Sequence, residues 1–105
     1  LGVSPSLADD HKAWIETQVT NDHLSAEIHL RAARDALLEF RLTSVRNARG
    51  GHASTVQSGR ARLKAGEERI MNHLRLSTGN DAHYLLILEV FENDRRVAVD
   101  RVTFP

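Results

Sequence analysis

The sequence predicts an all-β fold, an antiparallel β-sandwich of about seven short strands. Three observations predict it. Apolar residues recur with a period of two in several segments, as they do in half-buried strands. Clusters of turn-forming residues separate these segments at the spacing of roughly 8 to 12 residues that is typical of sandwiches. Tyr84 comes directly before the most apolar segment, which is where an immunoglobulin-like sandwich carries its tyrosine corner.

The strands follow from this alternation. Residues 24–31 and 36–43 place an apolar side chain at every second position, although Leu37 adds an apolar residue on the polar face of the latter. Residues 70–76 alternate in the same way except at Asn72. The expected strands, in chain order, are residues 14–19, 24–31, 36–43, 55–63, 70–76, 84–91 and 97–104.

The segment from Tyr84 to Phe91 holds the longest apolar run. Apart from Glu89 it is apolar on both faces, which predicts a central strand covered on both sides. Tyr84 itself fits either the tyrosine corner or an ordinary core aromatic. Further upstream, "RGGH" at residues 49–52 is interpreted as a hairpin loop, because a phosphate-binding loop would need a following Lys-Ser/Thr pair and a helix.

Two segments could instead form short helices. "SLADDHKAWIE", residues 6–16, has a possible capping box, Ser6 with Asp9. "RAARDALLEFRL", residues 31–42, is rich in helix-forming residues. The regular succession of short strands favours the sandwich over these alternatives.

The chain has the length of about one domain. Residues 1–10 combine Gly, Pro, Ser and two Asp with little periodic apolar content, so we expect a flexible N-terminal arm. Residues 11–105 are expected to form a single immunoglobulin-like β-sandwich domain. The longest apolar run is far shorter than the roughly 20 residues that span a bilayer. No signal peptide opens the chain, so an exported protein would be present here in its mature form.

The composition excludes several classes of function. The 105 residues are 41% hydrophobic and 27% charged with a net charge of zero, which gives no bulk attraction for nucleic acid or anionic membranes. A single Trp and a single Tyr offer no stacking platform for bases. The absence of cysteine excludes disulfides, thiolate metal sites and thiol catalysis, and leaves the cellular compartment open.

Six histidines raise the question of a metal site. They form no H-x-H or H-x-x-x-H pair and lie in different expected elements. His29 and His73 point outward from strands that could be neighbours, but no third ligand can be named. We therefore interpret the histidines as solvated surface imidazoles and expect no metal and no cofactor. Because Ser54 and Ser58 have no evident base nearby and no nucleophile elbow occurs, we also expect no enzymatic activity.

The segment "STVQSGRARLKAG", residues 54–66, carries Arg60, Arg62 and Lys64 and hardly any apolar bulk. Two interpretations stay open. In the first, these charges protect an edge strand from uncontrolled pairing with other chains. In the second, the same basic edge, or the face beside it, makes transient contact with an extended, acidic or amide-rich partner.

Three long segments carry a resemblance to a known family: "AWIETQVTNDHLSAEIHL", "ALLEFRLTSVRNARGGHASTVQSGRARLKAGE" and "LRLSTGNDAHYLLILEVFENDRRVAVDRVTFP". They resemble the small curli-associated chaperones of the CsgC/CsgH type, most nearly the CsgH branch of alphaproteobacteria. The similarity extends over nearly the whole chain after residue 12, and "S-T-x-Q-S-G" followed by a basic segment and "A-G-E" is its most telling part. The Cys-x-Cys pair of the enterobacterial branch is missing here, so a redox role does not carry over.

The resemblance implies a periplasmic chaperone that inhibits premature amyloid polymerisation of curli-type fibre subunits by transient, ATP-independent binding. Its partner, the client, would be an unfolded or pre-fibrillar subunit. The protein is expected to be a monomer that needs no cofactor, binds no nucleic acid and inserts into no membrane. One alternative is a structural or adhesive immunoglobulin-like module of a secreted assembly, which would bind a folded partner stably. Another is a metal-binding periplasmic protein, which isothermal titration with zinc or copper would test.

Local charge suggests where a client would bind. Basic side chains on outward positions or loops of the middle strands could attract carboxylates and polar groups of the client. The client-binding residues that we predict are Arg41, Arg46, Arg60, Arg62 and Lys64.

Overall fold

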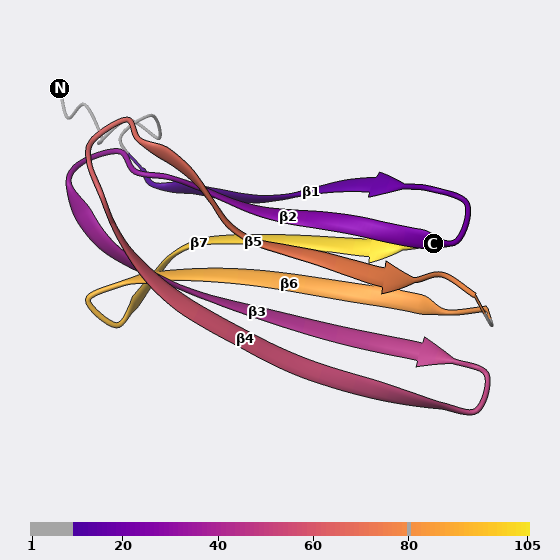
Figure 1. Cartoon of the computed structure of the whole chain (residues 1–105). Helices are drawn as coiled ribbons and strands as arrows, with labels where there is room; N and C mark the ends of the chain where they lie inside the picture. The colour runs from indigo at the N-terminus through magenta and orange to yellow at the C-terminus, as the bar shows by residue number, and fades with distance from the viewer. Residues whose placement is uncertain (1–9, 80) are drawn as a thin grey trace, which may run out of the picture.

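The computed structural model describes residues 10–79 and 81–105, which form seven β-strands in two antiparallel sheets (Figure 1). One sheet has the order β1-β2-β5 and the other has the order β4-β3-β6-β7. The strands are β1 (Lys12–Val19), β2 (His23–Arg31), β3 (Ala36–Ala48), β4 (Gly51–Leu63), β5 (Glu68–Ser77), β6 (His83–Glu92) and β7 (Arg95–Phe104).

The predicted all-β sandwich of about seven strands is confirmed. The two segments with a helical alternative are not helical where they are described, since β1 runs through the end of residues 6–16 and β3 takes up the second half of residues 31–42. Among the described residues, no helix has the length and apolar character needed to cross a membrane. The expected N-terminal arm, residues 1–10, lies outside the described residues except for Asp10.

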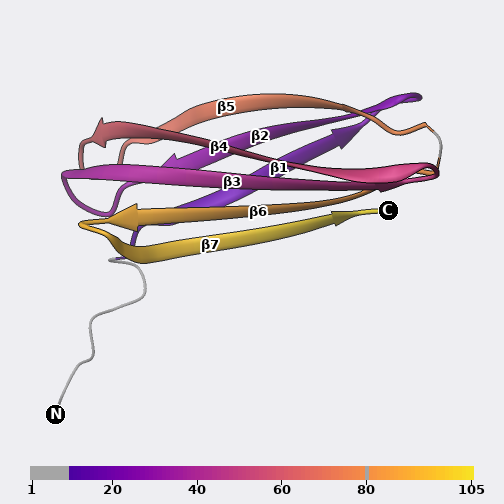
Figure 2. The same cartoon turned by 90° about the horizontal axis from the view of Figure 1, so that it is seen from below.

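The connections follow the immunoglobulin-like pattern with one variation. In the constant-type arrangement the fourth strand pairs with the fifth, whereas here β4 pairs with β3 and extends the sheet of β6 and β7. Figure 2 shows that the strands of both sheets run along the long axis of the molecule, which measures 55 × 27 × 24 Å.

The core lies between the sheets and is built from their central strands, β2, β3 and β6. In each of these strands the side chains at every second position are buried, which is the period-two pattern of the sequence. Each buried aliphatic or aromatic side chain stabilises the fold by about 1.5–3 kcal/mol. The residues concerned are Leu24, Ala26, Ile28 and Leu30 of β2, Leu38, Phe40 and Leu42 of β3, and Leu86, Leu88 and Val90 of β6.

The prediction that β6 is covered on both faces is wrong. Its inward side chains are buried, but Leu85 and Ile87 on the opposite face are only half-buried. That face is the outer surface of the four-stranded sheet, over which no other described element packs.

The β3–β4 hairpin is longer than predicted. Each of its strands has 13 residues, and residues 44–54, which the sequence did not assign to strands, extend both of them around the turn at Arg49 and Gly50. The expected hairpin loop is thus confirmed, and Gly50 has the positive φ of 96° that this turn requires. Residues 51–58 of β4 are exposed on both faces, so this part of the hairpin has no apolar pattern to reveal it.

Tyr84 forms the tyrosine corner, one of its two predicted roles. Its hydroxyl donates a hydrogen bond to the carbonyl oxygen of Ser77, and the Nε of Arg46 donates to the same hydroxyl at 3.1 Å. The side chain is also buried. Tyr84 therefore ties the start of β6 to the end of β5, which lies in the other sheet.

Two histidines are buried, so their interpretation as solvated surface imidazoles is wrong. The Nδ1 of His11 accepts a hydrogen bond from the Ala33 amide at 3.0 Å, and its Nε2 then carries the proton that it donates to Glu92 at 3.0 Å. His11 thereby ties the start of β1 to the loop after β2 and to the end of β6. The second buried histidine, His29, lies on the outer face of β2.

Gly59 of β4 lies directly opposite Phe40 of β3. A Cβ atom at residue 59 would lie 2.7 Å from Cε1 of Phe40, which is too close for two carbon atoms. The buried aromatic ring occupies the space that a side chain on Gly59 would need.

We expect Gly59→Ala to lower the free energy of unfolding by about 1–3 kcal/mol, because the added methyl group displaces the ring of Phe40 within the core. Urea denaturation followed by circular dichroism measures the change. Ser58→Ala, one residue earlier and on the exposed face, is the control and should stay within about 0.5 kcal/mol of the wild type. A Gly59→Ala protein as stable as the wild type would contradict the proposed contact.

We expect Tyr84→Phe to lower the free energy of unfolding by about 1 kcal/mol, because the carbonyl of Ser77 and the guanidinium of Arg46 both lose a partner. Arg46→Met is the matched comparison. It removes only the bond from Arg46 and should cost less. Equal midpoints for Tyr84→Phe and wild type would mean that the hydroxyl adds nothing to the stability of the fold.

Candidate functional site

Three basic residues lie along the edge of the four-stranded sheet, and we call them the basic edge: Arg60, Arg62 and Lys64. Arg60 and Arg62 project from the outer face of β4, and Lys64 follows directly after the strand. All three are exposed. Within residues 10–79 and 81–105, none of their side chains forms an ion pair or a hydrogen bond. Arg60 lies opposite Glu39 of β3, whereas the charges of Arg62 and Lys64 face solvent and are available to a partner.

The turn after β4 holds Lys64 in place. Glu67 accepts a hydrogen bond from the Lys64 amide at 3.0 Å and another from the guanidinium of Arg69 at 2.6 Å. The bond from the Lys64 backbone, followed by the interaction with Arg69, lowers the pKa of Glu67 below its ordinary value. Asp35 accepts a further bond from the Ala65 amide at 2.8 Å. Two carboxylates thus fix the turn at the end of the basic edge.

The structure places the other two predicted client-binding residues, Arg41 and Arg46, on opposite faces of β3. Arg41 of β3 lies on the same outer face as Arg60, opposite Ser58. Its guanidinium is 3.8 Å from a carboxylate oxygen of Glu89 and 5.2 Å from the centre of the Phe91 ring. Arg46 does not lie on an outward position, contrary to the prediction. It is at an inward position of β3, where it donates to Tyr84. The structure therefore brings four of the five residues to one face.

The side of the sandwich that carries the basic edge is open. β4 pairs with β3 along one of its edges, and no described strand pairs with its other edge. Between the two sheets at this side, the Asn72 side-chain amide of β5 donates to Gln57 of β4. On the opposite side β1 lies against β7, and the Ile15 amide donates to Asp100 at 2.8 Å. An extended segment can therefore reach β4 more readily than β7.

An apolar strip lies next to the basic edge on the outer face. Val56 of β4 and Val99 of β7 are 63% and 53% exposed, and Leu85 and Ile87 of β6 are half-buried between them. Sequence reasoning missed this strip because it placed both faces of β6 inside the fold. The sequence does contain a signal for this strip, because nearly every position of β6 is apolar. Such a pattern fits a strand with an uncovered binding face as well as a strand that is buried on both faces.

The three-stranded sheet carries a second cluster, Glu16, Glu27 and His29, whose ligand atoms all lie within 4.8 Å of one another. These residue types can hold a divalent cation. Sequence reasoning considered histidine pairs alone, and it missed this set because two of its members are glutamates on neighbouring strands. The predicted companion of His29, His73, is an exposed residue of β5 that lies opposite Glu27.

Comparison with known proteins found chains of similar structure. No protein-family model matches the chain, and neither does any curated protein sequence. The structure is similar to the curli protein CsgC of E. coli, with a TM-score of 0.75 and 15% sequence identity over 87% of this chain and 96% of CsgC. It is also similar to CsgH of R. palustris, with a TM-score of 0.64 and 17% identity over 85% of this chain and 89% of CsgH.

The same sandwich also occurs within a much larger protein. A β-glucuronidase of Bacteroides uniformis matches 90% of this chain with a TM-score of 0.59 and 16% identity, but the match covers 14% of the enzyme. At such identities the similarity shows the fold and no shared activity. CsgC and CsgH differ from the glucuronidase in that the match takes up most of their own length.

Proposed function

We propose that this chain, whose fold is of the CsgC/CsgH type, is a curli-associated periplasmic protein that keeps curli-type amyloid subunits from polymerising prematurely. It binds the subunit transiently, as a monomer, without ATP or a cofactor, and it is not an enzyme. One observation carries the proposal: the similarity in fold to two curli-system proteins extends over nearly the full length of each.

The open edge of β4 supports a physical mechanism. Amyloid grows when an unpaired strand adds to an exposed strand edge. A client segment that pairs with β4, or rests on the apolar strip beside it, is withdrawn from such growth while it is bound. In the free protein, like charges along the basic edge disfavour uncontrolled pairing of β4 with other chains, so the protein does not itself offer an edge that propagates.

The exposed charges of the basic edge favour rapid association with the client. Because Arg60, Arg62 and Lys64 have no ion-pair partner within the described chain, a client carboxylate can approach them without displacing an internal one. Such charge complementarity raises association rates more than it raises affinity. Weak, rapid binding is sufficient when the target is a rare pre-fibrillar species.

We expect the protein to lengthen the lag phase of a curli-type major subunit at well below one molecule per subunit. Thioflavin fluorescence measures the lag, with serum albumin at equal mass as control. No effect at equimolar ratio would contradict the proposed function for the subunit tested. A stable, stoichiometric complex with a folded partner in pull-down experiments would instead favour the structural or adhesive module.

Replacing the basic edge tests the site. The triple variant Arg60→Ser, Arg62→Ser and Lys64→Ser should need about tenfold more protein for the same lag, since each exposed charge contact contributes about 0.2–1 kcal/mol. The control replaces Lys12, Arg75 and Arg95, which are exposed elsewhere, by serine and changes the net charge equally. If the edge variant inhibits normally but self-associates in size-exclusion chromatography, the charges only protect the edge and the proposed contact surface is wrong.

A further inference from the structure

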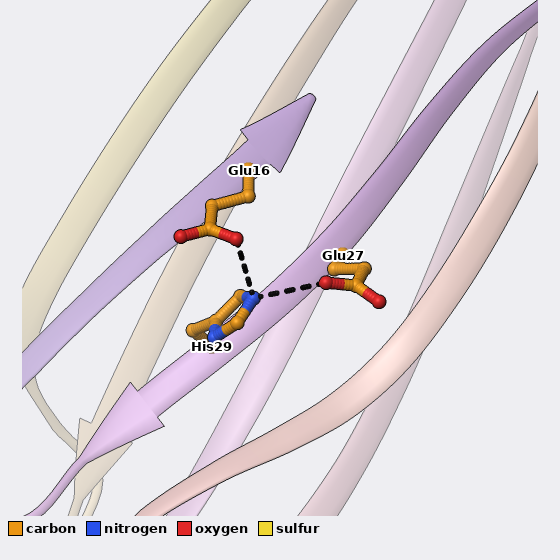
Figure 3. Close-up of side chains that lie close together, drawn as sticks. All are labelled: Glu16, Glu27 and His29. Atoms are coloured by element: carbon orange, nitrogen blue, oxygen red, sulfur yellow. Dashed lines mark hydrogen bonds and ion pairs between the residues drawn. The ribbon is translucent and has the colours of Figure 1, made fainter. Parts of the chain in front are cut away.

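The outer face of the three-stranded sheet holds a buried imidazole between carboxylates (Figure 3). His29 of β2 is 5% exposed although it points away from the core. Glu16 of β1 and Glu27 of β2 both direct an oxygen at its Nε2, each at 3.3 Å. Two carboxylates therefore converge on one nitrogen atom, which can donate a single proton.

The two distances to Nε2 are compatible with a bound zinc ion as well as with long hydrogen bonds. Charge-assisted bonds between nitrogen and a carboxylate measure about 2.7–2.9 Å. Ligand atoms that surround a tetrahedral Zn²⁺ at about 2.0–2.1 Å lie about 3.3 Å from each other. The carboxylates are 60% and 40% exposed, so Glu16 and Glu27 can adjust to close the site around an ion.

The imidazole of His29 is held in position on all sides. Trp14, opposite it on β1, stacks on the ring with a centroid distance of 5.1 Å and an angle of 16° between the planes. Its Nδ1 has no hydrogen-bond partner within the described chain, and the nearest charged group is a carboxylate oxygen of Glu68 at 3.6 Å. A metal-bound histidine characteristically directs its second nitrogen at a carboxylate in this way.

The charges at this place are unbalanced. Glu16 and Glu27 are direct cross-strand partners, and like charges in this arrangement destabilise a sheet. Neither forms an ion pair with a Lys or Arg within residues 10–79 and 81–105. Glu68 differs, because it lies opposite Arg31. A divalent cation would convert the repulsion between Glu16 and Glu27 into shared coordination across β1 and β2.

We propose that Glu16, Glu27 and His29 bind one Zn²⁺ ion, with Glu68 orienting the imidazole. Glu16 and Glu27 line a hollow together with Gln18 and Ser25, and water from this hollow would complete the coordination. The site is on the opposite sheet from the basic edge and is independent of client binding.

Titration with ZnCl₂ tests the site. Isothermal calorimetry should give one ion per chain, and the emission of Trp14, the single tryptophan of the chain, should change with the same midpoint. Glu16→Gln, at an exposed side chain that leaves the fold intact, and His29→Gln should each weaken binding by at least about tenfold. Glu68→Gln should weaken it by about 10–100-fold, as is usual for groups that orient a ligand.

His52→Gln is the control, because His52 is exposed in the β3–β4 hairpin, on the other sheet. It should bind Zn²⁺ like the wild type. Circular dichroism of each variant separates lost binding from lost structure, and Glu16→Gln decides the question if His29→Gln does not fold. The proposal is overturned if the wild type gives neither heat nor a change in emission up to about 1 mM, the range of the weakest extracellular metal modules. It is equally overturned if Glu16→Gln binds with unchanged affinity.

Discussion

The burial of one apolar face of β2 against the apolar faces of β3 and β6 is the constraint on which the rest of this structure depends. Side chains alternate between the two faces of a strand, so no inward position can shift by one residue without turning every neighbour outward. In this chain the inward positions of β2 are Leu24, Ala26, Ile28 and Leu30. Once they face the core, Glu27 and His29 must lie on the outer surface together. The core thus determines which polar residues become neighbours, although it makes no contact with any of them.

The same packing leaves the two sides of the sandwich unequal. The side formed by β1 and β7 is closed by Asp100, which accepts a hydrogen bond from the Ile15 amide, and by His11, which bonds to Glu92. The side formed by β4 and β5 is crossed by the bond between Asn72 and Gln57. β4 contributes Ala61 and Leu63 to the core at one end, whereas residues 51–58 of the strand are exposed on both faces. A polar, charged edge strand is what such a position requires, whether or not it binds a client.

The sequence predicts those parts of the fold in which a strand buries one face in the core. Alternation locates β2, β3 and β5 and an apolar run locates β6, whereas the position of Tyr84 before that run left the tyrosine corner and a core aromatic as two possible roles. Residues 44–48 have the polar side chains of Ser44 and Arg46 at inward positions, and residues 51–54 are exposed on both faces, so neither segment carries an apolar alternation. Arg46 lies beyond the expected strand of residues 36–43, and the polar residues around it do not reveal that the alternation continues from the inward side chain of Leu42. The cluster around His29 depends on the register between β1 and β2, which no spacing within a single segment reveals.

A net charge of zero conceals local groups of like charge on both outer faces. On the four-stranded sheet, Arg60 and Arg62 have no ion-pair partner within the described chain, and on the three-stranded sheet Glu16 and Glu27 have no Lys or Arg partner within it. Bulk composition therefore excludes attraction at long range but says nothing about contact at close range, where individual charges act within about 10 Å. The sandwich itself also occurs inside a β-glucuronidase, so the fold cannot account for either surface. The two proposed sites lie on different sheets, so a protein bound at the basic edge and a cation bound at Glu16, Glu27 and His29 would not compete for the same surface.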